Sequence, residues 1–465
     1  MPRWPRAAAP AALAAFLAGG GTASGQVTSS LNRSGSGARA AGMANAFVAV
    51  SDDGTAASWN PAGLAQLRKP EFSLVYTVSE RGLDFKGMRS GDGRTAYSNR
   101  HFDYTNSSPD FASATLPFVI ARKPVTVQFG WQRIYQLSGT LSGDVLRTTL
   151  GEGAGPPTLL NVDLLNVDNE LRGDIDRGSL SLAVKLTGRL SVGGSLNVWR
   201  GAWRENLGVV EPSATASDFV DIRTDNRIRG ENLTVGLLLT YPRFNVGLVY
   251  HTAFWSAFRF HRETRSNRLP PLIYDAGSRA QFRFPHSLAG GVAWRPAPRW
   301  TVALDLTHDQ WTDTLVRGLT DLPAPVNFFD GMPPRFSAAR DTTSLNVGGE
   351  RLFLREGSVL PLRLGFAWEP QGAMDPVTRD PVDWFMIAGG GGYNTNALKF
   401  DAAVQYRWGG FRVSDIIEVD SVLSGGPVRD AFGQATAREW RIKLSAIYRI
   451  PDTDKLRELV GRIFG

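Results

Sequence analysis

Few residues of this chain have the types and spacing that catalysis or metal binding requires. Its 465 residues include five histidines and no cysteine, which excludes a thiol nucleophile, a thiolate metal site and a disulfide. The sequence has no Gly-x-Ser-x-Gly motif, no phosphate-binding loop and no His-rich metal spacing. His308 and Asp309, near the end of an expected strand, are the one pairing of interest, and we interpret them as interfacial residues. We expect no enzyme, no cofactor and no metal.

One segment has residues that could recognise an apolar molecule with an anionic end. Aromatic and basic residues interleave in FWSAFRFHRETRSNR, residues 254–268, which includes Phe258, Arg259 and Phe260. Aromatic side chains at the mouth of a channel can take up an apolar ligand, and arginines can attract its carboxylate. The alternative is an aromatic girdle at a membrane edge, including Phe254 and Trp255, followed by arginines that meet lipid phosphates. The sequence leaves both interpretations open.

Cations also recur on the polar faces of expected strands, where Arg363, Arg407 and Lys443 are candidates for binding an anionic headgroup. A hydrogen bond to a charged group is worth roughly 1.5–3 kcal/mol. Burial of a long acyl chain, at about 0.8 kcal/mol per methylene, is worth on the order of 10 kcal/mol. The tail would therefore supply the affinity and the cation the orientation. The alternative is that these cations form ion pairs with acids of the N-terminal segment.

The elements that would position these residues are long alternating strands. From 125 to 137, one face carries mainly Val, Phe, Trp and Tyr, and the other mainly Thr, Gln and Gly; residues 440–450 repeat the pattern. Such strands have twelve or more residues, longer than the usual five or six. Long strands with an apolar outer face and a polar inner face are typical of a transmembrane barrel, in which every backbone amide is paired. A large soluble all-β protein is the alternative.

The connections support a barrel. Short turns are expected at 122–124, 187–189, 241–243, 295–299 and Gly409-Gly410, on the periplasmic side. Long polar connections are expected near 81–110, 138–178, 201–228, 256–280, 313–356 and 424–436, on the outer side. Together they predict about fourteen strands, if a weak strand runs over 411–422 and a longer periplasmic turn lies near 369–382.

The N-terminal part differs from the rest. Residues 1–25 are predicted to be a secretory signal, with a basic start, an alanine-rich run over 7–18 and a small-residue cleavage site before Gln26. The stretch GSGARAAGMANAFVAVSDDGTAASWNPAGLA, residues 35–65, consists of small residues that suit a compact element packed inside a larger one. Within it, Asn60 can cap a turn while Pro61 fixes φ before Ala62.

That stretch resembles the N-terminal hatch of the FadL/TodX-like family of outer-membrane transporters, in which an Asn-Pro-Ala turn closes a plug in the barrel lumen. The segments at 284–288, LRLGFAWEP and LKFDAAVQYRW resemble strands of the same family. The resemblance implies an all-β fold: a 14-stranded antiparallel transmembrane β-barrel whose hatch plugs the lumen. We predict a signal (1–25), a hatch (26–70), a barrel (71–450) and a C-terminal periplasmic tail (451–465). Many such barrels end on Phe, whereas here the last strand closes at Ile450 and Pro451.

The implied function is passive uptake of long-chain fatty acids or related hydrophobic compounds across the outer membrane, by loop capture, lumen binding and release past the hatch. The partners expected are a hydrophobic small molecule, and lipid or lipopolysaccharide of the outer membrane. We expect a monomer and, without a basic stripe, no nucleic acid. The alternative function is a shuttle or scaffold for a protein secretion system, because similar N-termini occur in such barrels.

Overall fold

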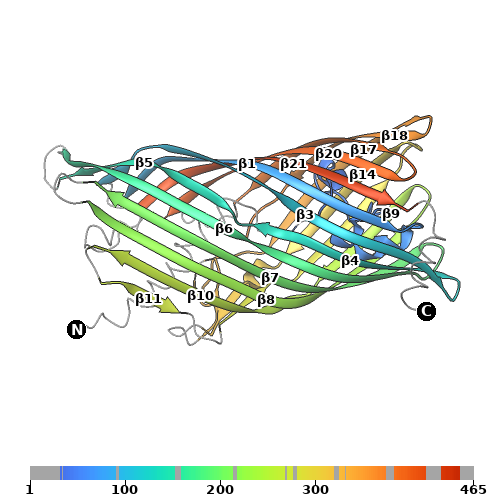
Figure 1. Ribbon diagram of the computed structural model, residues 1–465, viewed down its shortest axis with the longest axis horizontal. Coiled ribbons are helices and arrows are strands. Elements are labelled where there is room, and N and C mark those ends of the chain that lie inside the picture. The colour runs from blue at the N-terminus through green and yellow to red at the C-terminus, as the bar shows by residue number, and fades with distance from the viewer. Residues whose placement is uncertain are drawn as a thin grey trace.

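The computed structural model describes residues 32–33, 35–90, 94–151, 159–212, 217–267, 270–275, 280–318, 324–329, 331–372, 382–414 and 431–450. The expected signal and C-terminal tail lie outside this part of the chain. The described residues form a closed barrel of 14 antiparallel strands, as predicted. The last strand pairs with the first, from Glu71–Arg449 to Ser90–Ala431, and this pairing closes the wall (Figure 1).

The sheet has 21 strand segments, because several barrel strands are interrupted. β4 and β5 both pair with β6 and together form one barrel strand. In the same way, β9 and β10 both pair with β8. The segments are β1 (Glu71–Ser90), β2 (Thr95–Tyr97), β3 (Arg100–Ile120), β4 (Lys123–Gln136), β5 (Gly139–Leu150), β6 (Leu159–Lys185), β7 (Leu190–Glu211), β8 (Asp218–Thr240), β9 (Phe244–His251), β10 (Phe254–Ser266), β11 (Leu272–Asp275), β12 (Gln281–Phe284), β13 (Ser287–Trp294), β14 (Trp300–Asp309), β15 (Leu315–Arg317), β16 (Val326–Asn327), β17 (Thr342–Arg355), β18 (Ser358–Trp368), β19 (Trp384–Asn394), β20 (Leu398–Ser414) and β21 (Ala431–Arg449).

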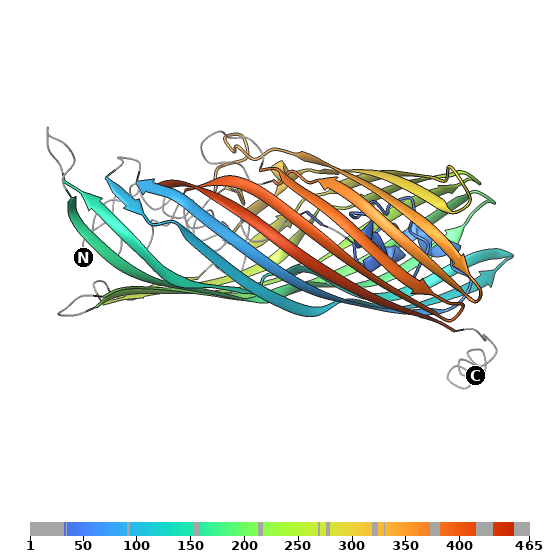
Figure 2. The same ribbon diagram turned by 90° about the horizontal axis from the view of Figure 1, so that it is seen from above.

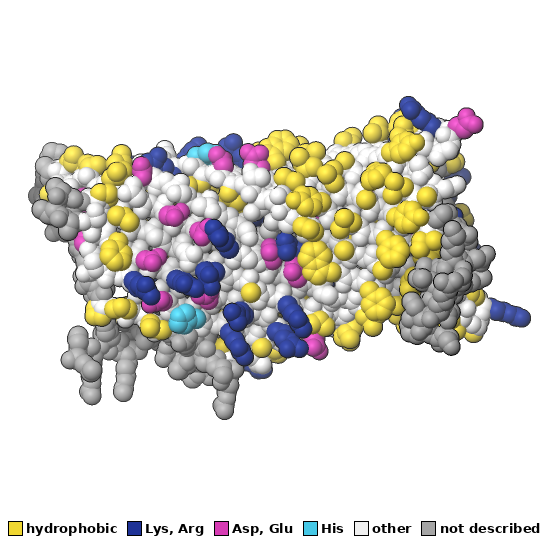
Figure 3. All heavy atoms as spheres, in the orientation of Figure 1, with side chains coloured by type: hydrophobic (Ala, Val, Ile, Leu, Met, Phe, Trp, Pro, Cys, Tyr) yellow, Lys and Arg dark blue, Asp and Glu magenta, His cyan; other side chains and the backbone are white. Residues whose placement is uncertain are grey.

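An apolar belt surrounds one half of the barrel. On β8, Leu233, Val235, Leu237 and Leu239 are exposed, and the residues between them are buried. The other half carries many charged side chains, and Figure 3 shows the boundary between the two halves. Such a continuous apolar exterior requires a lipid environment, and the polar half extends beyond it.

No helix among the described residues is long and apolar enough to cross a membrane.

Several expected outer loops are in fact strands. The structure continues β1 to Ser90, β6 from Leu159, β7 to Glu211, and β10 across Phe254–Ser266. The prediction was wrong because the outward faces of these stretches are largely polar and charged, while apolar residues such as Val209, Val220 and Ile222 are buried on the opposite face. Their charges are balanced across the sheet instead: Arg204 of β7 bonds Asp225 of β8 at 2.6 Å. Strands that continue past the bilayer need no apolar outer face, so alternation alone misses them.

The expected turn at Gly409-Gly410 is also wrong, because β20 runs straight through it. A Cβ on Gly409 would lie 3.0 Å from the Trp384 ring, so this glycine makes room for an aromatic side chain. The tight turns of this region lie instead at 356–357 and 395–397. The connection after β18 therefore lies at the outer end, opposite the predicted side. Residues 415–422 of the predicted weak strand lie outside the described residues.

Residues 35–70, here called the lumen segment, lie inside the barrel at the end with the short turns (Figure 2). They form α3 (Ala38–Gly42) and the short 3-10 helices η1 (Ala56–Ser58) and η2 (Pro61–Gln66); a further 3-10 turn, η3 (Trp311–Asp313), follows β14. α3 packs on β18 to β21 and η2 on β6, β7 and β8. Almost the whole segment is buried, so the small residues of the sequence serve close packing.

Candidate ligand-binding site

The lumen contains an aromatic cluster between the lumen segment and the outer half of the barrel. Trp199 of β7 is fully buried, with its ring centre 5.4 Å from that of Phe254 and 5.3 Å from that of Phe284. The phenyl rings of Phe254 and Phe284 stack at 4.8 Å. The buried members are Tyr135, Ile175, Trp199, Ile228, Phe254, Phe258, Ala280, Phe284, Val316 and Val326. Strands far apart in sequence thus supply one apolar surface inside a largely polar barrel.

Phe258 and Phe260, expected in an outer loop at the mouth, lie on strand β10 instead. Phe258 is buried in the aromatic cluster, and Phe260 packs against it at a ring distance of 6.1 Å from Phe258. Arg259 lies between them on the opposite, exposed face of β10. The strand alternation therefore separates the two phenylalanines from the arginine that was predicted to act with them.

A buried cation at the edge of this cluster was missed by sequence reasoning. Arg177 of β6 lies 5.9 Å from the centre of the Trp199 ring and donates to the Gln132 side-chain oxygen at 2.6 Å. Its Nε is buried without a hydrogen-bond partner, and no carboxylate among the described residues forms an ion pair with it. Arg33 is nearby: both arginines line one cavity of about 60 Å³, and Arg33 Nη1 is also buried without a partner. The pair therefore has unused donors for an anion.

The wall beside the cluster is interrupted. The ladder between β3 and β4 ends at Phe111–Gln132, although β4 pairs with β6 as far as Gln136. Residue 110 is skipped in the β3–β1 register and residue 134 in the β4–β6 register, so two bulges face each other. Pro109, which has no N–H to donate, precedes the first bulge. Beyond the bulges, the Asn106 side chain donates to the Ser138 carbonyl.

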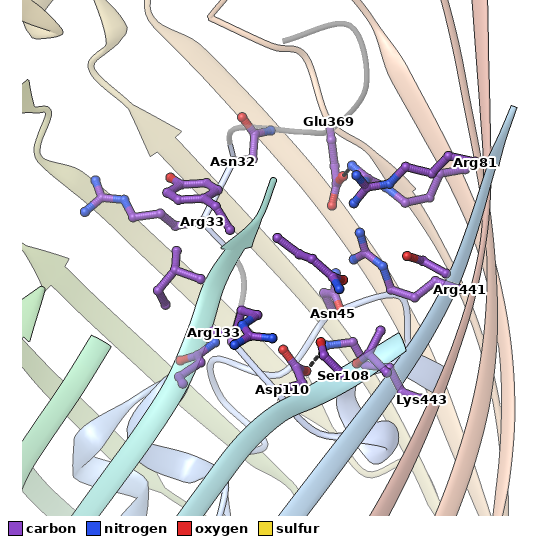
Figure 4. Close-up of a pocket in the computed structure, with 18 residues that line it drawn as sticks. Asn32, Arg33, Asn45, Arg81, Ser108, Asp110, Arg133, Glu369, Arg441 and Lys443 are labelled. Carbon is purple, nitrogen blue, oxygen red and sulfur yellow. Dashed lines mark hydrogen bonds and ion pairs between the residues drawn. The ribbon is translucent and has the colours of Figure 1, made fainter. Parts of the chain in front are cut away.

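A polar cavity of about 80 Å³ opens beside this interruption, between β1, β3, β4, β21 and the lumen segment. Figure 4 shows Arg81, Arg441 and Lys443 directed into one space, facing Asp110 and Glu369. Ile134, Tyr135 and Gln136 line the same cavity. The interruption therefore borders both the polar cavity and the aromatic cluster, which shares Tyr135 with it.

The three lumen cations predicted from sequence all have carboxylate partners. Arg363 bonds Glu350 and Asp401, each at 2.7 Å, and its side chain is fully buried. Arg407 bonds Glu369 at 2.7 Å and Glu439 at 3.0 Å, and Lys443 bonds Asp110 at 2.5 Å. Arg407 and Lys443 line the polar cavity, whereas Arg363 belongs to a network around the lumen segment.

That network crosses from the barrel to the lumen segment. Arg39 of α3 bonds Glu350 at 2.9 Å and also pairs with Asp52. Burial raises the pKa of Asp53, but Lys399, Arg39 and two hydrogen bonds from Thr55 outweigh it and hold the pKa below its ordinary value. Barrel side chains, Glu350 and Lys399, thus balance part of the segment's charges, and Arg39 balances Asp52 within the segment.

The Asn-Pro-Ala corner rests on the barrel wall. Asn60 caps η2 by accepting from the Ala62 N–H at 3.1 Å, and its amide donates to the carbonyls of Val48 (3.1 Å) and of Leu237 on β8 (3.0 Å). Pro61 lies against Gly193 of β7: a Cβ added to Gly193 would be 2.6 Å from the Pro61 carbonyl oxygen. The three predicted hatch residues therefore link the lumen segment to two strands of the wall.

Glycine pairs in the strands make this docking possible. In four glycine pairs, a Cβ added to one glycine would point toward the lumen segment and lie within 3.1 Å of other atoms. A Cβ added to the other glycine would have no atom nearer than 3.7 Å. The pairs are Gly193-Gly194, Gly290-Gly291, Gly348-Gly349 and Gly389-Gly390. The alternation of a strand turns each second glycine outward. Side chains then satisfy the segment's backbone: Asp305 accepts from Phe47 and Val48 N–H groups at 2.6 and 2.7 Å.

Within the described residues, no group of three or more His, Cys, Asp or Glu side chains could hold a metal ion. His308 bonds the Thr343 hydroxyl on the exposed side of β14, whereas Asp309 is buried. The two side chains thus point to opposite faces and do not form a pair.

Comparisons with known proteins support the fold. No family model and no curated protein matches the sequence. Among solved structures, a Pseudomonas aeruginosa FadL homologue superposes with a TM-score of 0.63 at 14% identity, covering 90% of this chain and 99% of that one. The toluene transporters TodX of P. putida (TM-score 0.54) and TbuX of Ralstonia pickettii (0.53) have the same identity and coverage. The chain has the fold of these outer-membrane barrels.

Proposed function

We propose that this protein takes up long-chain fatty acids or closely related hydrophobic acids across the outer membrane. The observation that carries the proposal is the aromatic cluster with Arg177 at its edge. Structural neighbours named as a FadL homologue and as toluene transporters support uptake of hydrophobic compounds in general. A cation with unused donors favours an acid over a hydrocarbon, because toluene offers it no acceptor.

The two parts of the site have different energetic roles. An acyl chain that displaces water from the aromatic surface gains about 0.8 kcal/mol per methylene. A carboxylate that accepts from Arg177 gains roughly 1.5–3 kcal/mol, and it satisfies a donor that is otherwise buried without a partner. The chain supplies most of the affinity, and Arg177 selects the acid.

The route we propose starts at the outer mouth, where Phe260 and Trp203 extend the cluster. It continues past Trp199 to Tyr135 and leaves sideways, beside the hatch, through the interrupted wall between β3 and β4. The lumen segment is the hatch in this proposal, held by its glycine contacts and ion pairs. Arg259, Arg363, Arg407 and Lys443 do not bind the chain; Arg407 and Lys443 keep the cavity beside the exit hydrated. We propose that one chain functions as a monomer.

Competitive binding tests this proposal. Purified protein in a short-chain detergent is titrated with radiolabelled oleate and, separately, with toluene. We expect R177Q to weaken oleate binding about tenfold, as loss of a charged hydrogen bond implies, and to leave toluene binding unchanged. F258S should weaken both, and the matched control F336S, which alters an exposed phenylalanine, should weaken neither. Equal oleate affinity of R177Q and wild type would refute the role of Arg177.

A second outcome separates transport from the secretion-scaffold alternative. A scaffold needs no apolar ligand site, so oleate and toluene would both fail to bind saturably, and F258S would change nothing. The aromatic cluster is the observation that favours the transporter.

A further inference from the structure

Four exposed arginines on the outside of the barrel are not used by the proposed transport site. Arg200 of β7 lies directly opposite Arg229 of β8, and Arg227 of β8 lies directly opposite Arg259 of β10. All four side chains are exposed on the outward face. Opposed residues in a sheet have Cβ atoms about 4.5–5.5 Å apart, so these residues, the outer arginine cluster, form one compact basic patch.

Among the described residues, no ion pair neutralises the charge of this patch. No ion pair or hydrogen bond joins any of its four side chains to another described residue. Asp176, which lies opposite Arg200 on β6, is paired with Arg133 at 3.2 Å. Glu231, exposed on β8 two residues from Arg229, makes no ion pair among the described residues. Farther from the belt, by contrast, Asp225 bonds both Arg204 and Arg223.

Like charges directly opposite each other destabilise a sheet. The two arginine pairs therefore reduce the stability of the sheet. The fold does not require them, since Arg204 and Asp225, farther along the same two strands, have opposite charges and form an ion pair. An anionic partner at this position would offset this loss of stability.

The position of the cluster identifies the partner. On β7 and β8 the apolar belt ends at Leu196 and Leu233, both about half exposed. The first arginines, Arg200 and Arg229, lie four residues farther along each strand toward the outer end, Arg200 after Leu196 and Arg229 before Leu233. Figure 3 shows Lys and Arg side chains gathered beside the belt, on the half away from the short turns. In a barrel with short periplasmic turns, this height is the headgroup level of the outer leaflet.

We propose that the outer arginine cluster binds the phosphates of lipid A, the membrane anchor of lipopolysaccharide. Guanidinium groups bind phosphate through parallel bidentate hydrogen bonds, and two arginine pairs match a headgroup with two phosphates. The acyl chains of the same molecule lie along the belt below, at Leu196 and Leu233. The proposal is independent of the transport site, which opens to the inside of the barrel.

Native mass spectrometry of the detergent-purified protein, titrated with diphosphoryl lipid A, tests the proposal. The variant R200Q/R227Q/R229Q/R259Q is compared with R122Q/K123Q/R189Q/R243Q, which removes four exposed cations from the short turns. We expect the first variant to lose at least tenfold in affinity for diphosphoryl lipid A, and the second to retain wild-type affinity. Monophosphoryl lipid A should bind the wild type more weakly, and the difference between the two lipids should shrink in the cluster variant.

Wild-type affinity in the cluster variant, or an equal loss in both variants, would overturn the proposal. Equal binding of phosphatidylglycerol and lipid A by the wild type would also overturn it, because a general anionic-lipid surface would then suffice. A heat-dependent shift on SDS gels reports folding of each variant. If the fourfold variant does not fold, R200Q/R229Q decides the question, with an expected loss of three- to tenfold. Oleate binding should be unchanged in every variant.

Discussion

Replacing Gly193 by alanine tests whether the glycine pairs exist to seat the lumen segment. A Cβ at this position would lie 2.5 Å from the Ala62 nitrogen and 2.6 Å from the Pro61 oxygen, both backbone atoms that cannot rotate away. The nearest atom, the Pro61 carbonyl carbon, would lie at 2.4 Å, whereas ordinary contact begins at 3.4 Å, so the corner must move by 1.0 Å (3.4 minus 2.4). Overpacking of this kind costs about 1–3 kcal/mol.

The matched control is the next residue in the chain. A Cβ on Gly194 would have nothing nearer than the Thr234 carbonyl oxygen at 3.8 Å. Alanine has less conformational freedom to lose than glycine, so G194A should be neutral or more stable by about 0.4–1 kcal/mol. The two variants have the same composition and differ only in the face that receives one methyl group.

Urea-induced unfolding in lipid vesicles, followed by tryptophan fluorescence, gives the difference in free energy. We expect G193A to be less stable than G194A by about 1–4 kcal/mol, as the two ranges combine. Limited proteolysis should also cut the lumen segment faster in G193A. Equal stability and equal proteolysis of the two variants would refute the idea that Gly193 is needed for the Asn-Pro-Ala corner to lie on the wall.

Three further perturbations test the polar side of the same docking. Asn60→Ala removes the cap of η2 and two hydrogen bonds to carbonyls, and should cost about 1.5–5 kcal/mol in urea unfolding; Asn60→Asp keeps the cap but turns a buried carboxylate toward the two carbonyl oxygens, so it should cost at least as much. Arg363→Met leaves Asp401 buried without its ion-pair partner and should cost about 3–5 kcal/mol, whereas the exposed Arg351→Met should cost little. Asp53→Asn removes a carboxylate whose pKa is lower in the folded protein than in the unfolded chain. Such a carboxylate stabilises the folded state at pH values above its unfolded pKa, and this stabilisation is lost as the pH falls through its folded pKa. Asp53→Asn should therefore be less stable than wild type at pH 7, and the difference should shrink below about pH 4; a difference independent of pH would contradict this assignment.

The barrel was predictable because strand alternation in a lipid environment is a local property of the sequence. The strands at 125–137 and 440–450 appear as β4 and β21, and their period of two needs no knowledge of partners. The extent of the strands was not predictable in this way. In β6 and β7 the outer halves are stabilised by cross-strand charges, and such pairs are visible only once the register is known. For the same reason Gly409, which packs on Trp384, was mistaken for a turn.

The candidate site was predictable only where one strand carries several of its residues. Phe258 and Phe260 belong to β10, and their spacing of two places both in the lumen. Trp199 and Phe284 join them from other strands and have no contiguous motif. Arg177 fell in the outer connection expected over 138–178 but lies on β6. Its lack of a carboxylate partner among the described residues is a property of its neighbours, which the sequence around it does not reveal. One usable signal was overlooked: Pro109 within a strand indicates a bulge or an edge.

The arrangement of polar and apolar surfaces in the lumen explains why the exit we propose lies in the wall. Buried ion pairs such as Arg363 with Glu350, and Glu350 with Arg39, lie between the barrel wall and the lumen segment. An acyl chain that passed there would have to separate charges whose isolation costs about 3–5 kcal/mol per pair. The aromatic cluster instead ends at Tyr135, beside the interrupted ladder, where the β3 and β4 backbones no longer pair with each other. The path of lowest cost for an apolar molecule therefore turns sideways before it reaches the network, and the hatch can stay in place during transport.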